Sequence, residues 1–291
     1  MNEKNVLEMV DRMQQLNNLL LAQEVEFSIE FTKVWKNNTE LEGYVLKSSK
    51  YNCAPTIYKN DNWYNKTDEE VVEFLMSMFK ELSCQVDVSK FMKKDFITAN
   101  VYPRLVSQDN SNELEQRGIA HMKFLDMNIL FYLRIDSFDD EFGSLQVTDN
   151  LLETADITID DAYNCALFNI ESQVEIKTME EVLCDQFGIN LEDFGEPQCP
   201  MVVCTTKDKL QGAATMLCES VLIDLEERIG GKVAILPSSI HEFIAIPYSQ
   251  DQDFDMFLNM VKEINTNEVS AEDKLTDSVY VVKNQKIQLA I

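Results

Sequence analysis

The chain has 291 residues, of which 51 are acidic and 25 basic, so its formal net charge is −26. With 45% apolar residues it can bury a substantial core. The negative potential over its surface disfavours direct nucleic-acid binding, which depends on contacts with phosphates. No apolar run approaches the roughly 20 residues of a membrane-spanning helix, and the first residues lack the pattern of a signal peptide. We therefore expect a cytoplasmic protein without membrane contact.

The cysteines are odd in number and include no C-x-x-C pair. Most lie inside apolar patterns, which favours reduced, buried thiols over a disulfide framework. The closest pair, Cys199 and Cys204, flanks a predicted strand and has no neighbouring third and fourth ligand, so we expect no metal and no cofactor. The seven positions are Cys53, Cys84, Cys165, Cys184, Cys199, Cys204 and Cys218.

The first third of the chain predicts a helix, a hairpin and a second helix. Residues 6–21 place apolar side chains at intervals of three and four, as in an amphipathic helix. Residues 25–32 alternate apolar and polar side chains, and a turn at 36–39 joins this predicted strand to a second one at 41–46. Thr67-Asp68-Glu69-Glu70 matches a capping box and opens the second helix.

A polar stretch at 107–112 is the best candidate for a connection between halves. It would separate an amino-terminal α+β region of residues 1–110 from a carboxy-terminal α+β region of residues 111–291, although one continuous domain is the alternative. After it, residues 127–133 are apolar nearly throughout, which predicts a central strand covered on both faces.

The remaining elements alternate without regular βαβ units. This order favours an α+β fold with a largely antiparallel sheet flanked by amphipathic helices. The predicted elements are helices that begin after Thr158 and Thr178, a strand at 200–205, a helix at 217–229, strands at 232–236 and 243–246, a helix at 254–264 and a strand at 278–282.

Loops that bind nucleotides are missing from the sequence. Its eight glycines form neither G-x-G-x-x-G nor G-K-[ST], so there is no glycine-rich cradle for phosphate. There is also no G-x-S-x-G elbow of an α/β-hydrolase. A kinase, a dehydrogenase or an α/β-hydrolase is therefore not expected.

Residues 235–247 join two apolar runs through a polar corner. Convergence of its side chains could supply a nucleophile, a base and an orienting carboxylate. Because strand neighbours point to opposite faces, His241 and Ser239 would share a face that Glu242 opposes. The interpretation we favour is that the serine hydroxyls satisfy turn amides and the imidazole opens the next strand. The catalytic candidates are Ser238, Ser239, His241 and Glu242.

Two further groups are candidates for binding. His121 and Asp126 precede the central strand, and a metal site shared with His241 would need Asp126, Glu242 or a cysteine as a further ligand. Nothing in the spacing requires such a site. Aromatic side chains among asparagines suit either a contact surface or packing over the hairpin, and the candidates are Tyr58, Trp63 and Tyr64.

Eight short segments, in this order, carry a resemblance to a family. They are 36–38, 55–58, 104–106, 121–126, 180–183, 212–214, 236–242 and 276–280, of which 236–242 is the most specific. Together they resemble the clostridial and Firmicutes domain-of-unknown-function family 5688. The resemblance implies a cytoplasmic bacterial protein and supplies no reaction, cofactor or catalytic residue. It also leads us to expect a small apolar residue at position 128, where this chain has Asn128.

These observations favour a non-enzymatic, cytoplasmic protein-binding module with an acidic surface, whose partner is another protein with a basic surface. One alternative is a hydrolase or metal-assisted enzyme centred on His241. The other is an acidic mimic of nucleic acid that inhibits a DNA-binding protein, which requires carboxylates in rows at the spacing of DNA phosphates.

Overall fold

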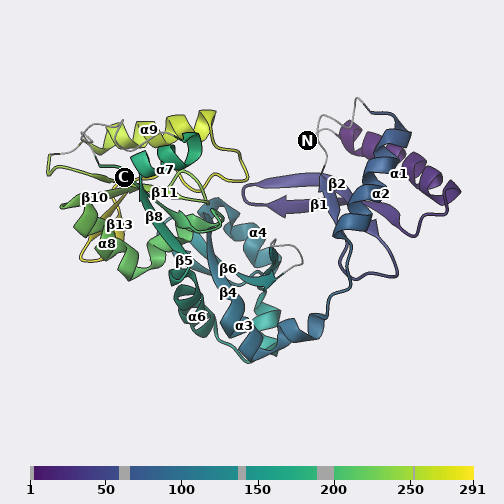
Figure 1. Ribbon diagram of the computed structural model, residues 1–291, viewed down its shortest axis with the longest axis horizontal. Helices are drawn as coiled ribbons and strands as arrows, with labels where there is room; N and C mark the ends of the chain where they lie inside the picture. Colours follow the sequence, from purple (N-terminus) through teal and green to yellow (C-terminus); the bar gives the residue numbers. More distant parts are fainter. Residues whose placement is uncertain (1–2, 59–65, 137–141, 189–199, 252) are drawn as a thin grey trace. The chain divides into compact units, whose positions relative to one another are not determined.

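The computed structural model describes residues 3–58, 66–136, 142–188, 200–251 and 253–291, and it divides into two compact units between Val88 and Ser89 (Figure 1). Helices and antiparallel sheets occur in both units, which confirms the predicted α+β class. The stretch at 107–112, where a connection was expected, continues inside the second unit as short helices. Within the described ranges, no helix has the length and apolar character needed to cross a membrane.

The first unit packs two helices against a three-stranded antiparallel sheet in the order β1-β2-β3. The predicted capping box is present, since the Thr67 hydroxyl accepts from the Glu70 amide at 3.3 Å and the Glu70 carboxylate accepts from the Thr67 amide at 2.8 Å. The elements are α1 (Glu3–Ala22), β1 (Ser28–Lys36), β2 (Thr39–Lys47), β3 (Thr56–Tyr58) and α2 (Asp68–Leu82).

The hydrophobic core of the first unit consists of side chains from this unit. The side-chain amide of Asn17 donates to the Ile29 carbonyl and accepts from the Ile29 amide, both at 2.9 Å, which fastens α1 to β1. The buried hydroxyl of Tyr44 donates to the Met9 carbonyl at 2.8 Å. The buried side chains are Met9, Leu16, Leu20, Phe27, Ile29, Tyr44, Leu46, Val71, Val72, Leu75 and Phe79.

In the second unit, six antiparallel strands form a sheet in the order β13-β12-β10-β11-β9-β8. Helix α9 buries Phe257 and Val261 on the face that carries Ala234 and Ile246, and α8 covers the opposite face (Figure 1). The elements are β8 (Val174–Thr178), α7 (Met179–Phe187), β9 (Val202–Thr206), η5 (Gly212–Leu217), α8 (Glu219–Ile229), β10 (Val233–Leu236), β11 (Phe243–Pro247), α9 (Phe254–Asn267), β12 (Tyr280–Lys283) and β13 (Lys286–Leu289).

A four-stranded sheet completes this unit, with β6 paired to β4 on one side and to β5 and β7 on the other. Residues 127–133 of β6 are all buried, as predicted for a central strand. Asn128 is fully buried as well, and its amide nitrogen donates to the Ser111 hydroxyl at 3.1 Å. The elements are η2 (Val88–Met92), α3 (Lys94–Asn100), β4 (Val101–Ser107), η3 (Gln108–Asn110), α4 (Ser111–Gln116), β5 (His121–Phe124), β6 (Met127–Asp136), β7 (Phe142–Gln146), α5 (Asp149–Thr154) and α6 (Ile159–Glu171).

Because the first core draws only on residues 9–79, a fragment of residues 1–88 should fold by itself. We expect helical circular dichroism and a cooperative melting transition. A fragment of residues 1–60 is the matched control, because it keeps the hairpin and α1 but lacks the four core side chains of α2. It should show no cooperative transition. Non-cooperative melting of the longer fragment would contradict the independence of this unit.

Candidate functional site

The two sheets of the second unit meet where loops after β9, between β10 and β11, and before β12 approach the four-stranded sheet. Asp126, in the turn between β5 and β6, accepts hydrogen bonds from the hydroxyls of Thr276 at 3.0 Å and Ser278 at 2.7 Å. The Tyr280 hydroxyl is its third donor. Burial, together with the hydrogen bond to Asp126, raises the pKa of Tyr280, so this hydroxyl remains a donor. Internal groups therefore hold the Asp126 carboxylate.

His241 lies at the same junction and both of its ring nitrogens have partners. Nδ1 accepts from the backbone amide of Gln211 at 3.3 Å, and Nε2 lies 3.1 Å from Oδ1 of Asp273. A nitrogen that accepts an amide proton carries none, so the neutral ring is protonated on Nε2 and donates to Asp273. No hydroxyl or thiol in the described part of the chain hydrogen-bonds to the ring. The imidazole ring thus joins the loop after β9 to the loop before β12.

The two serines of the corner take part in its backbone geometry. The Ser239 hydroxyl accepts from the His241 amide at 3.0 Å, and Ser239 is buried. The Ser238 carbonyl accepts from the Leu275 amide at 3.1 Å. Serine side chains commonly satisfy turn amides in this way. Ser239 therefore stabilises the turn through its hydroxyl, and Ser238 joins the turn to the next loop.

A close approach of backbones fixes this corner. The Thr205 hydroxyl donates to the His241 carbonyl at 2.8 Å. A Cβ atom on Gly212 would lie 2.4 Å from that carbonyl oxygen and 2.5 Å from the Thr205 hydroxyl oxygen. Only glycine fits without displacing the loop, which explains why Gly212 opens the buried segment η5.

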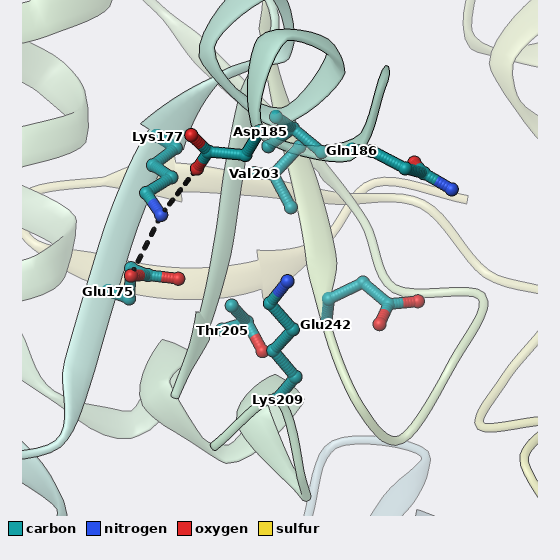
Figure 2. A pocket seen from close by; sticks show the side chains of 9 residues that line it. Glu175, Lys177, Asp185, Gln186, Val203, Thr205, Lys209 and Glu242 are labelled. Atoms are coloured by element: carbon teal, nitrogen blue, oxygen red, sulfur yellow. Dashed lines mark hydrogen bonds and ion pairs between the residues drawn. The ribbon is translucent and has the colours of Figure 1, made fainter. Parts of the chain in front are cut away.

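Glu242, which follows His241, contributes to a pocket of about 400 Å³ (Figure 2). The pocket lies on the side of the sheet where Figure 1 shows α7 and α9. Its floor follows from strand register, since Glu175 lies opposite Thr205 and Lys177 lies opposite Val203. Helix α7 contributes one wall. The lining residues are Glu175, Lys177, Val182, Asp185, Gln186, Val203, Thr205, Lys209 and Glu242.

Some of the charged side chains that line the pocket form ion pairs with one another, and others do not. The Lys177 ammonium lies 2.9 Å from Asp185 and 3.0 Å from Glu175, and its hydrogen bond lowers the pKa of Asp185. Figure 2 shows the Lys209 side chain pointing into the pocket. Within the described ranges, the side chains of Lys209 and Glu242 form no hydrogen bond or ion pair. One cation and one carboxylate are thus available to a ligand or partner.

Arginine and tyrosine side chains alternate on the face of the four-stranded sheet that carries the even-numbered residues of β6. The Arg104 guanidinium lies 5.2 Å from the Tyr132 ring, which stacks on Tyr102 with centroids 5.9 Å apart. Arg134 lies 5.8 Å from the Tyr102 ring and pairs with Asp208 at 2.9 Å. Burial raises the pKa of Tyr132 to about 12 and lowers the pKa of Arg104. These contacts join β6 to the loop after β9.

The other described sequence candidates, His121 and Tyr58, are not among the residues that line the pocket. His121 donates from Nδ1 to the Ile119 carbonyl at 2.8 Å. Tyr58, in the first unit, has the Lys36 ammonium 5.3 Å from its ring centre. Trp63 and Tyr64 lie outside the described residues, as does Cys199. In the described part of the chain, no group of three or more His, Cys, Asp or Glu side chains could hold a metal ion.

Sequence reasoning reached Glu242 and missed the other charged residues of the pocket. Glu175 and Lys177 occur two apart in a strand, which places them on one face, but only the strand order brings Thr205 and Glu242 beside them. The sequence signal that could have found part of the pocket is the two-residue spacing of Glu175 and Lys177, which places both side chains on one face of a strand.

The fold and the junction define an α+β protein of two units whose second unit carries a charged pocket beside a closely packed corner. The chain belongs to a family of unknown function, DUF5688, whose model matches residues 6–283. No curated protein and no solved structure matches it.

Replacing Gly212 by alanine should destabilise the second unit by roughly 1–3 kcal/mol, because an overpacked site must shift its backbone. Gly231→Ala is the matched control, since a Cβ there meets nothing within 4 Å. Its effect should stay within about 0.5 kcal/mol. Urea unfolding at neutral pH measures both variants. Equal stability of the two would contradict the close approach.

Tyr132 should make the fold sensitive to alkaline pH. Its pKa is about 12 in the folded protein and about 10 in an unfolded chain, so it stabilises the fold below pH 10 and this contribution is lost as pH rises toward 12. Between roughly pH 10 and 12, wild type should lose up to about 2 kcal/mol more unfolding free energy than Tyr132→Phe. Urea unfolding at intervals of pH measures this difference. Parallel curves for the two proteins would contradict the burial of the hydroxyl.

Proposed function

We propose that this protein is a non-enzymatic, cytoplasmic protein-binding module that binds another protein with a basic surface. The observation that carries the proposal is a second apolar stripe on α9. Met256, Met260 and Ile264 are 52%, 44% and 38% exposed and follow one another on successive turns of the helix. Phe257 and Val261 are the side chains that hold α9 on the sheet.

An amphipathic helix needs one apolar face to pack on a sheet. The exposed stripe adds nothing to that packing, and it costs free energy while it faces water. Contiguous exposed apolar side chains mark interaction surfaces more often than scattered ones do. Methionine side chains are flexible and adapt to the shape of a partner. The stripe therefore favours a role in association.

Acidic side chains determine what kind of partner fits. Exposed Asp253, Glu263 and Glu268 lie at the two ends and along the side of the stripe, and most of the excess acidic charge of the chain lies in the second unit. Such a field attracts a basic surface and repels nucleic acid. The proposed partner is a protein segment with apolar anchor residues flanked by lysine or arginine.

The two other hypotheses remain predictions. A hydrolase or metal-assisted enzyme centred on His241 would need a nucleophile or a metal to displace Gln211 or Asp273 from the ring. A nucleic-acid mimic would compete with DNA for a DNA-binding protein. Neither hypothesis makes use of the apolar stripe on α9.

The proposal is tested by affinity purification from an extract of its native cells, with wild type and the double variant Met256→Gln/Met260→Gln as baits. We expect a basic protein to be retained by wild type and its yield to fall at least about tenfold with the variant. Raising salt from roughly 50 to 300 mM should also release it, because the Debye length shortens.

The control bait is Leu289→Gln, which changes a 50% exposed apolar side chain on β13 of the same unit. It should retain the partner as wild type does. Retention that is equal for all three baits, or that is unaffected by salt, would contradict the proposed surface.

A further inference from the structure

Two cysteines that are far apart in the sequence form a pair in the first unit. Cys53 lies between β2 and β3, and Cys84 follows the end of α2. They form an isolated antiparallel bridge in which the Cys53 amide donates to the Cys84 carbonyl at 3.1 Å and the Cys84 amide donates to the Cys53 carbonyl at 3.4 Å. Both thiols are free, and Cys53 is exposed.

This geometry suits a disulfide. Residues that exchange both hydrogen bonds across antiparallel strands have Cα atoms about 5.5 Å apart. Disulfides span about 4.4–6.8 Å between Cα atoms, most often about 5.5–6 Å. The two side chains of such a pair lie on the same face of the bridge. The Cα separation expected for Cys53 and Cys84 therefore lies within the range that a disulfide spans.

The same segments are held together by a second pair of hydrogen bonds. The side-chain amide of Asn52 donates to the Val86 carbonyl at 2.7 Å, and its oxygen accepts from the Val86 amide at 2.8 Å. Residues 52–53 and 84–86 thus form a clasp of four hydrogen bonds, which lies just before the boundary of the unit at Val88. In the reduced protein this clasp depends on these hydrogen bonds alone and lies near the end of a unit, where structures open most readily.

We propose that Cys53 and Cys84 form a reversible disulfide that locks this clasp in response to oxidation. The oxidant is a small disulfide such as oxidised glutathione. A thiolate of the pair attacks it and releases one glutathione thiol, and the other cysteine, as its thiolate, displaces the second. The two cysteine thiols lose two electrons and two protons, and the oxidant is reduced to two thiols.

Access to solvent distinguishes Cys53 from the two buried cysteines of the second unit. Cys204 and Cys218 are buried, and burial raises the pKa of each to about 12, so they do not form thiolates near neutral pH. Burial and the neighbouring Cys84 raise the pKa of Cys53 as well, so the exchange should quicken as pH rises above 7. Cys53 is nevertheless exposed, which allows attack from solution.

The test incubates the full chain at pH 8 with oxidised and reduced glutathione in varied ratio, followed by alkylation and tryptic digestion without reductant. Trypsin releases Cys53 in residues 51–59 and Cys84 in residues 81–90. We expect one cross-linked pair of these two peptides, which dithiothreitol separates again. Its yield should depend on the ratio of the two glutathione forms.

The variant Cys84→Ser should accumulate glutathione on Cys53 with no internal cross-link, and Cys165→Ser, at a half-buried cysteine of the second unit, should cross-link as wild type does. Oxidised wild type should also resist proteolysis at residues 85–93 longer than the reduced form. The proposal is overturned if no 51–59 to 81–90 cross-link forms, or if Cys84→Ser forms internal disulfides as readily as wild type.

Discussion

The carboxylate of Asp126 is the group on which the arrangement of the second unit depends. It receives three hydroxyl groups from residues 276–280, about 150 positions further along the chain. Hydrogen bonds to a charged acceptor contribute roughly 1.5–3 kcal/mol each, so one side chain joins two sheets strongly. At the opposite end of β6, Arg134 pairs with Asp208 and fixes the loop after β9. These two contacts, one at each end of β6, fix the loops of the six-stranded sheet in position along that strand.

In the corner at residues 238–242, two neighbouring polar side chains do different things. In this turn between β10 and β11, the His241 ring contacts Gln211 and Asp273, whereas Glu242 lines the pocket. The imidazole therefore serves packing between loops, and the neighbouring carboxylate is left available. Two polar residues that are neighbours in the sequence therefore need not belong to one site, since His241 contacts two loops and Glu242 lines the pocket.

Local signals in the sequence predicted local structure correctly. The capping box at Thr67, the hairpin of β1 and β2, and the buried strand at 127–133 each depend on neighbours within a few residues. On α9, by contrast, Phe257, Met260 and Ile264 have the three- and four-residue spacing of one apolar face, but only Phe257 is buried. Apolar spacing shows that a helix forms, and the tertiary fold decides which of its sides finds a partner. The pocket and the Cys53–Cys84 pair depend on strand order and long-range pairing, which no local pattern encodes.

The acidic surface and the exposed stripe of α9 are better understood together than separately. An apolar stripe on a neutral protein would favour association with other copies of itself. A net charge of −26 opposes that association, because like charges face each other across any such contact. The same charge lowers the cost of approach for a basic partner. In the proposed function, the electrostatic field would select which protein the stripe binds, and the stripe would supply the apolar contact that charge alone cannot provide.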